Sequence, residues 1–219
     1  MRLAVLGASG RTGKIVVREA IARGHEVTAV VRNLKKLTDK HDNLQVVTAD
    51  IFDPDSLVSY FEGRDAVLSC LGCGPSVFSM RKITFFTDSI QPIVEAIRKV
   101  KVTRLVFMSS WYTKHNSADP FIVNWVLKPL LLGQTLRNSG EMEDFLETEC
   151  PDVRYTSVRS PELSDSESTG KPVLFMEGQS IQSAERKRFV VCRKDVAKFM
   201  IDITEKDEHI RKCMAIASG

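Results

Sequence analysis

The segment FMSSWYTKHN, residues 107–116, combines residue types that commonly do chemistry. Its serine hydroxyls can hydrogen-bond a ligand, its two large aromatic rings can stack on one, and its tyrosine, lysine and histidine can exchange protons. A tyrosine is a stronger proton donor when a lysine follows it by four residues on one helix face, because the ammonium lowers the pKa of the phenol. Lys114 follows Tyr112 by only two residues, so this segment does not supply that pair.

The Tyr–Lys spacing is also missing from the rest of the sequence. The residues that follow the three tyrosines by four positions are Arg64, Asn116 and Arg159. The helix predicted over 121–149 contains no tyrosine, and its lysine, Lys128, directly precedes Pro129. We therefore expect that the protein does not interconvert ketones and alcohols through an activated phenol.

The elements that must position these residues follow an alternating pattern. The apolar, β-rich runs are residues 2–7, 26–31, 44–49, 65–70, 103–110 and 153–158, and the helical patterns lie near 11–23, 54–61, 81–100 and 121–149. Short, almost continuously apolar strands separated by helices are typical of a parallel sheet that is covered on both faces. The sequence therefore predicts an α/β fold with a doubly wound parallel sheet, the Rossmann fold.

The last quarter of the chain departs from this alternation. Residues 160–172 are polar and rich in Ser, Pro and Gly, which indicates an excursion from the sheet. Late strands are predicted near 173–178, 188–192 and 213–218, with a helix near 194–205. We expect a single domain, 1–219, in which 160–192 form a small cap-like excursion over the substrate.

The composition argues against several classes of protein. The formal charge of +3 on 219 residues, without a long Lys/Arg block, does not suggest a nucleic-acid surface. No apolar run approaches the roughly 18 residues of a membrane span, and the sequence starts with an apolar strand rather than a signal-like leader. The Cys70–Cys73 pair has no second pair to complete a zinc site. We expect a cytoplasmic monomer or weak dimer that binds small molecules, with no metal, membrane or nucleic-acid partner.

A glycine array directly follows the first predicted strand. In GASGRTG, Gly7, Gly10 and Gly13 have GxxGxxG spacing and precede an amphipathic helix. Glycine permits positive φ and a close approach of the backbone to a phosphate, and the helix start presents unpaired N–H groups. Within a βαβ unit this arrangement predicts the pyrophosphate site of a dinucleotide.

The end of the second strand indicates which dinucleotide is bound. An NAD site usually carries a carboxylate there, for the ribose 2′-hydroxyl. This chain has Arg32 instead, with Lys35 and Lys36 just beyond, and Arg11 of the glycine loop can point to the same place. A planar guanidinium suits a 2′-phosphate, which a carboxylate would repel. We therefore predict NADPH rather than NADH as the cofactor.

Two further turns are expected at the same edge of the sheet. Asp50 follows the third strand where an adenine edge would lie, and Ile51 would face the ring; Asp53 is the better candidate to cap the next helix. Leu71 and Gly72 leave the fourth strand at its carboxyl end, the side on which such folds bind ligands.

These motifs, together with VTRLVFMSS, VRYTSVRSPEL and FVVCRKDVAKFM, resemble the atypical short-chain dehydrogenase/reductases. Within that group the chain is similar to the NAD(P)H-binding family typified by biliverdin reductase B, an NADPH-dependent flavin reductase. The resemblance implies that the pyrophosphate is held by Gly7, Ser9, Gly10, Arg11, Thr12 and Gly13, and the 2′-phosphate by Arg32. It implies that Asp50 and Ile51 hold the adenine, that Leu71 and Gly72 lie on the ribose side, and that the nicotinamide is flanked by Ser109, Ser110, Arg159, Ser160 and Pro161.

The resemblance and the missing Tyr–Lys pair together favour a reductase of conjugated acceptors, such as a flavin, a biliverdin-like tetrapyrrole or a quinone. Such acceptors can take a proton from solvent, so positioning dominates. We expect Ser110 to hydrogen-bond the acceptor or the carboxamide, and Trp111 and Tyr112 to form a stacking wall. The alternative is a non-catalytic NADP(H)-binding sensor or assembly factor on the same fold, which would also lack the pair.

Overall fold

The computed structural model describes residues 1–73, 83–114, 121, 133–181 and 190–219. Its main sheet contains β1 (Arg2–Leu6), β2 (Glu26–Val31), β3 (Leu44–Thr48), β4 (Ala66–Ser69), β5 (Arg104–Ser110), β6 (Arg154–Ser160), β8 (Leu174–Glu177) and β10 (Lys212–Ala217). The strand order is β3-β2-β1-β4-β5-β6-β10-β8, and every neighbouring pair is parallel except β10 and β8. The predicted doubly wound parallel sheet is therefore confirmed.

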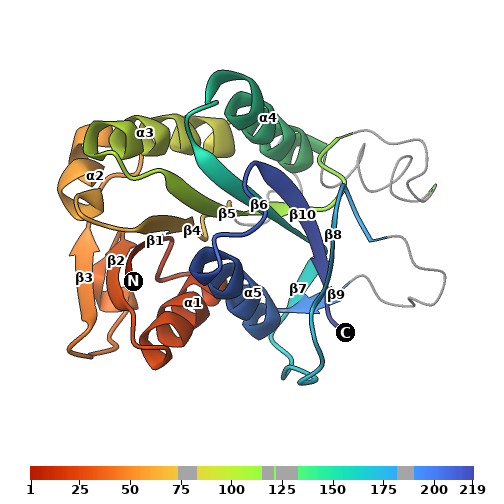
Figure 1. The fold of residues 1–219 in the computed structure, drawn as a ribbon, viewed down its shortest axis with the longest axis horizontal. Helices are drawn as coiled ribbons and strands as arrows, with labels where there is room; N and C mark the ends of the chain where they lie inside the picture. Colours follow the sequence, from red (N-terminus) through yellow and green to blue (C-terminus); the bar gives the residue numbers. More distant parts are fainter. Residues whose placement is uncertain (74–82, 115–120, 122–132, 182–189) are drawn as a thin grey trace.

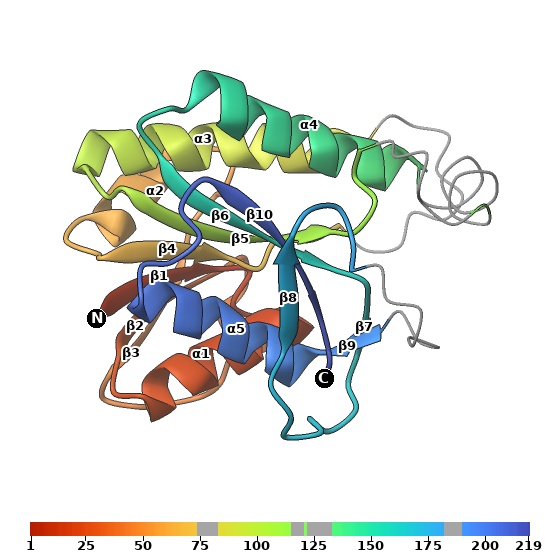
Figure 2. The same ribbon diagram turned by 45° about the vertical axis from the view of Figure 1, so that its right-hand side comes forward.

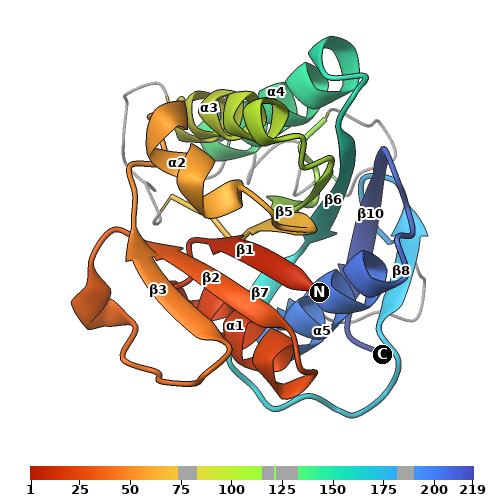
Figure 3. The same cartoon turned by 60° about the vertical axis from the view of Figure 1, so that its left-hand side comes forward.

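Among the described residues, five α-helices cover the two faces of this sheet (Figures 1–3). One face carries α1 (Arg11–Ala22) and α5 (Arg193–Glu205), and the other carries α2 (Pro54–Phe61), α3 (Phe85–Val100) and α4 (Gly133–Glu149). Successive strand residues point to opposite faces. In β1, Leu3 and Val5 join the apolar cluster under α1 and α5, whereas Ala4 and Leu6 join the cluster under the other three helices. Because both faces are buried, these strands need apolar residues at nearly every position.

Strand β1 lies at the point where the strand order reverses. It pairs with β2 on one side and with β4 on the other, and in these two ladders Leu6 lies opposite Val30 and Ser69. The connections that leave β1 and β4 run to opposite faces, so the carboxyl ends of these strands leave a crevice between them. Ligands of open α/β sheets bind in such a crevice.

Side chains satisfy the backbone at the starts of two helices on the second face. Asp53 caps α2 by accepting a hydrogen bond from the N–H of Asp55, as predicted. The start of α3 is completed from another element, because Asn138 of α4 accepts from the N–H of Phe86 at 2.8 Å and donates to Thr87 at 2.9 Å. The α3–α4 packing therefore includes a buried polar contact as well as apolar ones.

The C-terminal excursion divides between two sheets. Strand β7 (Glu162–Ser164) pairs with β9 (Val190–Cys192) in a small parallel sheet, whereas β8 extends the main sheet by pairing with β10. The segment 182–189 lies outside the described residues, as do 122–132 with Lys128 and Pro129 of the predicted helix 121–149. Its described part is α4, which begins at Gly133. The interpretation of 160–192 as a cap stays a prediction.

Three further observations concern the described part of the chain. None of its helices is long and apolar enough to cross a bilayer. It contains no group of three or more His, Cys, Asp or Glu residues that could hold a metal ion. All five cysteines lie within it, and each is a free thiol.

Candidate cofactor and acceptor site

The turn between β1 and α1 is so tight that only glycine fits at two of its positions. Gly7 has a φ of +68°, and a Cβ there would lie 2.7 Å from the carbonyl oxygen of Cys70. A Cβ on Gly13 would lie 2.2 Å from the carbonyl oxygen of Gly7, and the N–H of Gly10 donates to that oxygen at 2.9 Å. The glycines therefore bring the start of α1 directly against the end of β1.

The start of α1 has the features of an anion site. Gly10 is the N-cap and makes no side-chain cap, and the first turn contains no acidic residue. The first N–H groups of a helix have no intrahelical partner and carry the positive end of the helix dipole. Thr12 and Gly13 are buried in this turn, while Ser9 and Gly10 line the adjacent cleft. A diphosphate would satisfy the N–H groups that this turn leaves unpaired.

A cleft of about 480 Å³ opens at the crevice between β1 and β4. Its walls are Gly7, Ser9 and Gly10 of the glycine turn, Val30 and Val31 at the end of β2 with Arg32 and Lys36 beyond it, Ile51 and Phe52 after β3, and Cys70, Leu71, Gly72, Cys73 and Phe85 after β4. The fold thus brings seven of the predicted cofactor residues into one cleft. The glycine-walled cradle fits an extended dinucleotide.

The expected adenine end of this cleft is formed by Arg32 and the turn after β3. Arg32 is exposed and also lines an adjoining hollow of about 430 Å³, together with Asp50 and Ile51. Asp50 shapes this turn, because its carboxylate accepts from the N–H of Phe52 at 2.9 Å and its own N–H donates to Ser56. Asp50 therefore has a structural task besides any contact with adenine.

Phe52 is a cleft residue that the sequence analysis did not identify. Its ring is 49% exposed and packs edge-to-face on Phe85, with 6.0 Å between the ring centres. An exposed phenyl ring beside Arg32 offers a second surface on which adenine could stack. The sequence feature that could have identified Phe52 is its position directly after Asp50 and Ile51, at the carboxyl end of a strand.

Arg11 takes a different direction from the one expected. Its guanidinium pairs with Asp165, just after β7, and Asp165 also accepts from Arg193 at 2.8 Å. Arg11 thus connects the glycine turn to the C-terminal excursion rather than to the corner at Arg32. Its backbone N–H remains at the start of α1.

The expected nicotinamide end lies where β5 and β6 terminate together. Ser110 is opposite Ser160 in the ladder, and Ser160 donates to the carbonyl oxygen of Ser109 at 3.3 Å. The hydroxyl of Ser109 is buried and has no hydrogen-bond partner among the described residues. A buried hydroxyl without a partner is costly, so this group suits a ligand that bonds it, such as a carboxamide. Ser110 and Pro161 are half-buried beside it.

Arg159 does not face the cleft. Its side chain is almost completely buried and donates to Glu143 at 2.9 and 2.7 Å and to the carbonyl oxygen of Gly178 at 2.9 Å. Burial works against the charged guanidinium, but the hydrogen bonds and charge of Glu143 outweigh it and raise the pKa of Arg159. The side chain that was expected to flank the nicotinamide is therefore part of an internal ion pair.

Trp111 also differs from the expectation. The residue is 2% exposed, packs against Ala215 and Ala217 of β10, and donates its indole N–H to the carbonyl oxygen of Arg159 at 3.1 Å. It cannot offer an open stacking face in this arrangement. Tyr112 is half-buried and packs edge-to-face on the indole, so it is the ring of this pair that an acceptor could reach.

Glu143 organises this region and was not identified from the sequence. It is 1% exposed and accepts hydrogen bonds from Thr113 at 2.8 Å and from Ser157 at 2.6 Å, in addition to those from Arg159. Through Thr113 it holds the turn that follows β5. No local pattern distinguishes this glutamate from the others of α4; only its position opposite β6 does.

The turn after β5 is strained and tightly packed. Tyr112 has a φ of +63°, in the left-handed region that residues other than glycine rarely adopt. Helix α4 approaches so closely that a Cβ on Gly140 would lie 2.9 Å from the carbonyl oxygen of Thr113. Gln179 accepts hydrogen bonds from the N–H of Tyr112 through its carbonyl oxygen and from the N–H of Lys114 through its side chain. Such strain persists only where the surroundings enforce it, and it is concentrated at functional sites.

Lys114 and the thiols of Cys70 and Cys73 are unsuited to accept a proton at neutral pH. Lys114 contacts Asp144 at 2.6 Å, and this hydrogen bond raises the pKa of the ammonium. Burial raises the pKa of Cys70 to about 12 and also raises that of Cys73. At neutral pH the lysine therefore stays charged and the two thiols stay protonated.

Comparisons with known proteins agree with this geometry. The profile of a family described as NAD(P)H-binding matches residues 7–207. An uncharacterised chloroplastic protein of Arabidopsis thaliana is 28% identical over 98% of this chain and 75% of its own length. The photosystem II assembly factor Ycf39 of Synechocystis is 29% identical over 50% of this chain and 33% of its own length. The crystal structure of a candidate NADH-flavin reductase from Streptococcus pneumoniae superposes over the full length of both chains, with a TM-score of 0.79 and 24% identity.

Proposed function

This chain belongs to the NAD(P)H-binding family, and we propose that it is an NADPH-dependent reductase of a conjugated acceptor, such as a flavin, a tetrapyrrole or a quinone. The observation that carries the proposal is the state of the titratable groups beside the serines of β5. Among the described residues there, Glu143 is held in an ion pair, Lys114 is paired with Asp144, and the thiols of the cleft stay protonated. Substrates that need a proton from the protein during hydride transfer are therefore disfavoured.

In this proposal the cofactor supplies the hydride, and the chain binds and orients it. The first turn of α1 would bind the pyrophosphate through its N–H groups. Arg32 would pair with the 2′-phosphate, and Ile51 and Phe52 would contact the adenine. Ser109 would hold the carboxamide and so fix which face of the nicotinamide is open to the acceptor.

The acceptor would lie over Tyr112 and Ser110. The position of the phenol ring is fixed by the strained turn and by Trp111 behind it, so little side-chain freedom is lost when a flat acceptor stacks on it. Ser110 would hydrogen-bond a polar edge of that acceptor. The proton that accompanies the hydride would come from solvent, which a flavin or quinone permits.

A second candidate is a non-catalytic NADP(H)-binding sensor or assembly factor. It is supported by the similarity to Ycf39, although the match covers a third of that protein. The arrangement of described groups suits this role as well, because it provides for cofactor binding without a Tyr–Lys pair. A cytoplasmic location stays a prediction, and the Arabidopsis relative is described as chloroplastic.

Steady-state oxidation of NADPH would separate the two. The purified protein would be mixed with NADPH and, in turn, FMN, biliverdin and a soluble quinone, and the loss of nicotinamide absorbance would be followed. We expect turnover with at least one of these acceptors and none with Gly13→Ala, because the added Cβ would collide with the Gly7 carbonyl in the phosphate turn. Tight NADPH binding without oxidation by any acceptor would instead favour the sensor.

Gly72→Ala is a control for the effect on folding alone, because a Cβ at this cleft glycine meets no other atom of the chain within 4 Å. It should fold with an unchanged midpoint of thermal unfolding. If Gly13→Ala bound NADPH as tightly as the wild type, the phosphate assignment would be wrong.

A further inference from the structure

Strand β8 is exposed along its whole length, although it carries three large apolar residues. Leu174, Phe175 and Met176 are 46%, 51% and 46% exposed. The strand is the last in the sheet order, and within the described part of the chain nothing pairs with its outer edge. Exposed apolar edge strands tend to pair with another strand, and proteins usually protect them.

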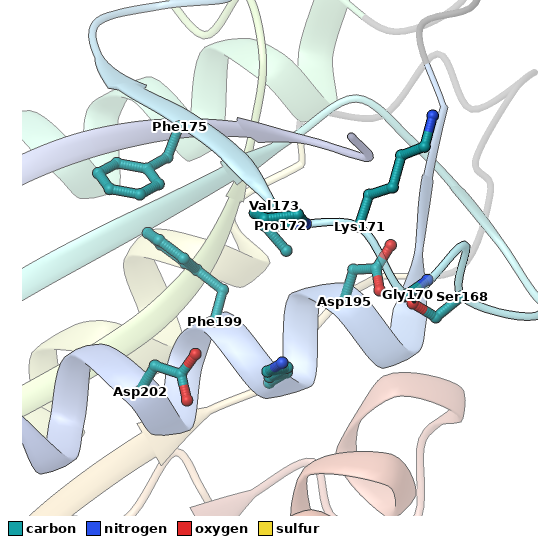
Figure 4. A pocket seen from close by; sticks show the side chains of 10 residues that line it. Ser168, Gly170, Lys171, Pro172, Val173, Phe175, Asp195, Phe199 and Asp202 are labelled. Atoms are coloured by element: carbon teal, nitrogen blue, oxygen red, sulfur yellow. Dashed lines mark hydrogen bonds between the residues drawn. The ribbon is translucent and has the colours of Figure 1, made fainter.

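A pocket of about 290 Å³ lies beside this strand, between the segment that leads into it and α5 (Figure 4). Phe175 and Phe199 lie side by side at one end, with 5.3 Å between their ring centres, and Pro172 and Val173 lie between them and Lys171. The pocket shares no lining residue with the cofactor cleft.

We propose that β8 pairs antiparallel with β8 of a second copy of this chain, about a two-fold axis at Leu174. This register places Lys171 opposite the partner's Glu177, and Val173 opposite the partner's Phe175. The two main sheets then form one continuous sheet. The proposal is independent of the reductase activity and concerns a different edge of the molecule.

The hydrogen-bonding pattern of β8 fits this register. The N–H of Gly178 donates to the carbonyl oxygen of Cys213 in β10, so every second residue back along β8, Met176 and Leu174, also directs its backbone toward β10. Val173, Phe175 and Glu177 therefore direct theirs outward. With the axis at Leu174 they form the hydrogen-bonded pairs with the partner strand, and Pro172 falls at a position that needs no N–H donor.

The charges favour a second copy in the antiparallel direction. Lys171 forms no ion pair within the described part of the chain, and Glu177 contacts Lys212 at 3.0 Å. Lys171 lies in the segment that leads into β8, and continuing the strand through this segment in the dimer would place Lys171 and Glu177, six residues apart, on the same face. In the antiparallel dimer the two-fold axis produces two contacts between Lys171 of one copy and Glu177 of the other. A parallel pairing in register would instead place Lys171 against its own copy.

The apolar residues are self-complementary in the same register. Phe175 points to the face of α5, because its ring contacts Phe199. Opposite residues of an antiparallel pair share a face, so the partner's Phe175 comes to rest beside Val173, over the pocket. On the other face, Leu174 meets its own copy, and Met176 meets the partner's Pro172. The dimer thus covers the exposed side chains of the strand.

Sedimentation velocity over a range of protein concentrations tests this proposal. The wild type should show a reversible, concentration-dependent dimer. Phe175→Lys should weaken it by more than about tenfold, because a charge would be placed in the apolar seam. Leu34→Lys is the matched control, since Leu34 is 51% exposed in the 3₁₀ turn after β2, far from β8, and it should change nothing.

Charge exchange tests the register itself. Lys171→Glu and Glu177→Lys should each weaken the dimer, and the double variant should dimerise more tightly than either single variant, with loss of the Glu177–Lys212 contact as the remaining deficit. A wild type that is monomeric at all concentrations would overturn the proposal, as would a dimer that Phe175→Lys leaves intact. Failure of the double variant to dimerise more tightly than the single variants would reject the register. Far-ultraviolet circular dichroism would confirm that each variant is folded, and none of these measurements requires turnover.

Discussion

The proposed preference for NADPH rests on the guanidinium of Arg32. It lies exposed at the end of β2, where an NAD-binding chain would have a carboxylate, and it lines both hollows at the adenine end. A charge-assisted hydrogen bond to a phosphate contributes about 1.5–3 kcal/mol. This stabilisation would apply to NADPH and not to NADH, because only NADPH has the 2′-phosphate.

Arg32→Ala should therefore weaken NADPH binding by about tenfold or more, while NADH binding changes little. Nicotinamide fluorescence titrations with both cofactors would measure the two changes. Lys36→Ala, at another residue of the cleft wall, serves as the charge-matched control and should have a smaller effect. Equal losses for NADPH and NADH would refute the assignment of Arg32.

Glu143 and Arg159 show how an internal ion pair can position a site that it does not touch. Removing one partner of a buried pair leaves an unpaired charge and typically costs about 3–5 kcal/mol. Glu143→Ala should lower the free energy of unfolding by that order. Glu143→Gln keeps the shape and part of the hydrogen bonding, so it should lose less.

The functional consequence of Glu143→Gln should fall on the acceptor rather than on the cofactor. Because Glu143 holds Thr113, a looser contact would release the strained turn at Tyr112. We expect a higher KM for the acceptor and an unchanged affinity for NADPH, as measured by steady-state kinetics and by fluorescence titration. Near-ultraviolet circular dichroism of the Trp111–Tyr112 pair reports the same loosening without turnover. If neither the spectrum nor the KM for the acceptor changed, Glu143 would contribute to the stability of the fold and not to the acceptor site.

At the scale of elements, the two helices that border the acceptor side depend on each other. The buried amide of Asn138 in α4 completes the start of α3, and no side chain of α3 itself caps this end. Loss of a capping group typically costs about 0.5–2 kcal/mol, and the buried N–H of Phe86 would also be left unpaired.

Asn138→Leu should therefore destabilise the protein by roughly 2 kcal/mol, as measured by urea denaturation. Leucine has the same number of side-chain heavy atoms and the same branching at Cγ as asparagine but cannot hydrogen-bond, so the loss would report mainly on the hydrogen bonds. Asp53→Ala removes the local cap of α2 and provides the comparison. A smaller loss for Asn138→Leu than for Asp53→Ala would show that the contact between the helices contributes less than a local cap.

For the molecule as a whole, the two proposed functions lie on different parts of the sheet. The cofactor cleft lies at the crevice beside β1, in the interior of the strand order, whereas β8 forms one edge of the sheet and β3 the other (Figure 1). Pairing through β8 therefore leaves the cleft accessible in both copies.

The pH dependence of the reaction is also a property of the whole site. The pKa shifts keep Lys114 and Arg159 charged and the thiols of Cys70 and Cys73 protonated, because the pKa of each of these groups is raised. As pH rises through the neutral range, none of them changes state. We expect kcat to be flat from about pH 6 to about pH 9 once any titration of the acceptor is subtracted. A bell-shaped profile would mean that the chain supplies an acid or base, against the proposal.

The sequence by itself determined the order of strands and helices, the glycine turn and the place of Arg32. These features depend on neighbours in the chain: apolar runs that are buried on both faces, glycines that a turn requires, and a residue at a strand end. The predicted strands agree with β1 to β6 to within one or two residues at their ends. The cap by Asp53 is equally local, and it is confirmed.

Only the tertiary structure decided the partners of the charged and aromatic side chains. Arg159 lies at a strand end that suggests the cofactor, but α4 places Glu143 against it. Trp111 lies in an exposed-looking turn, but β10 covers it. The exposed edge of β8 likewise exists because β10 returns between β6 and β8. The physical reason is the same in each case: burial and charge pairing depend on elements that are distant in sequence and become neighbours only when the sheet is assembled.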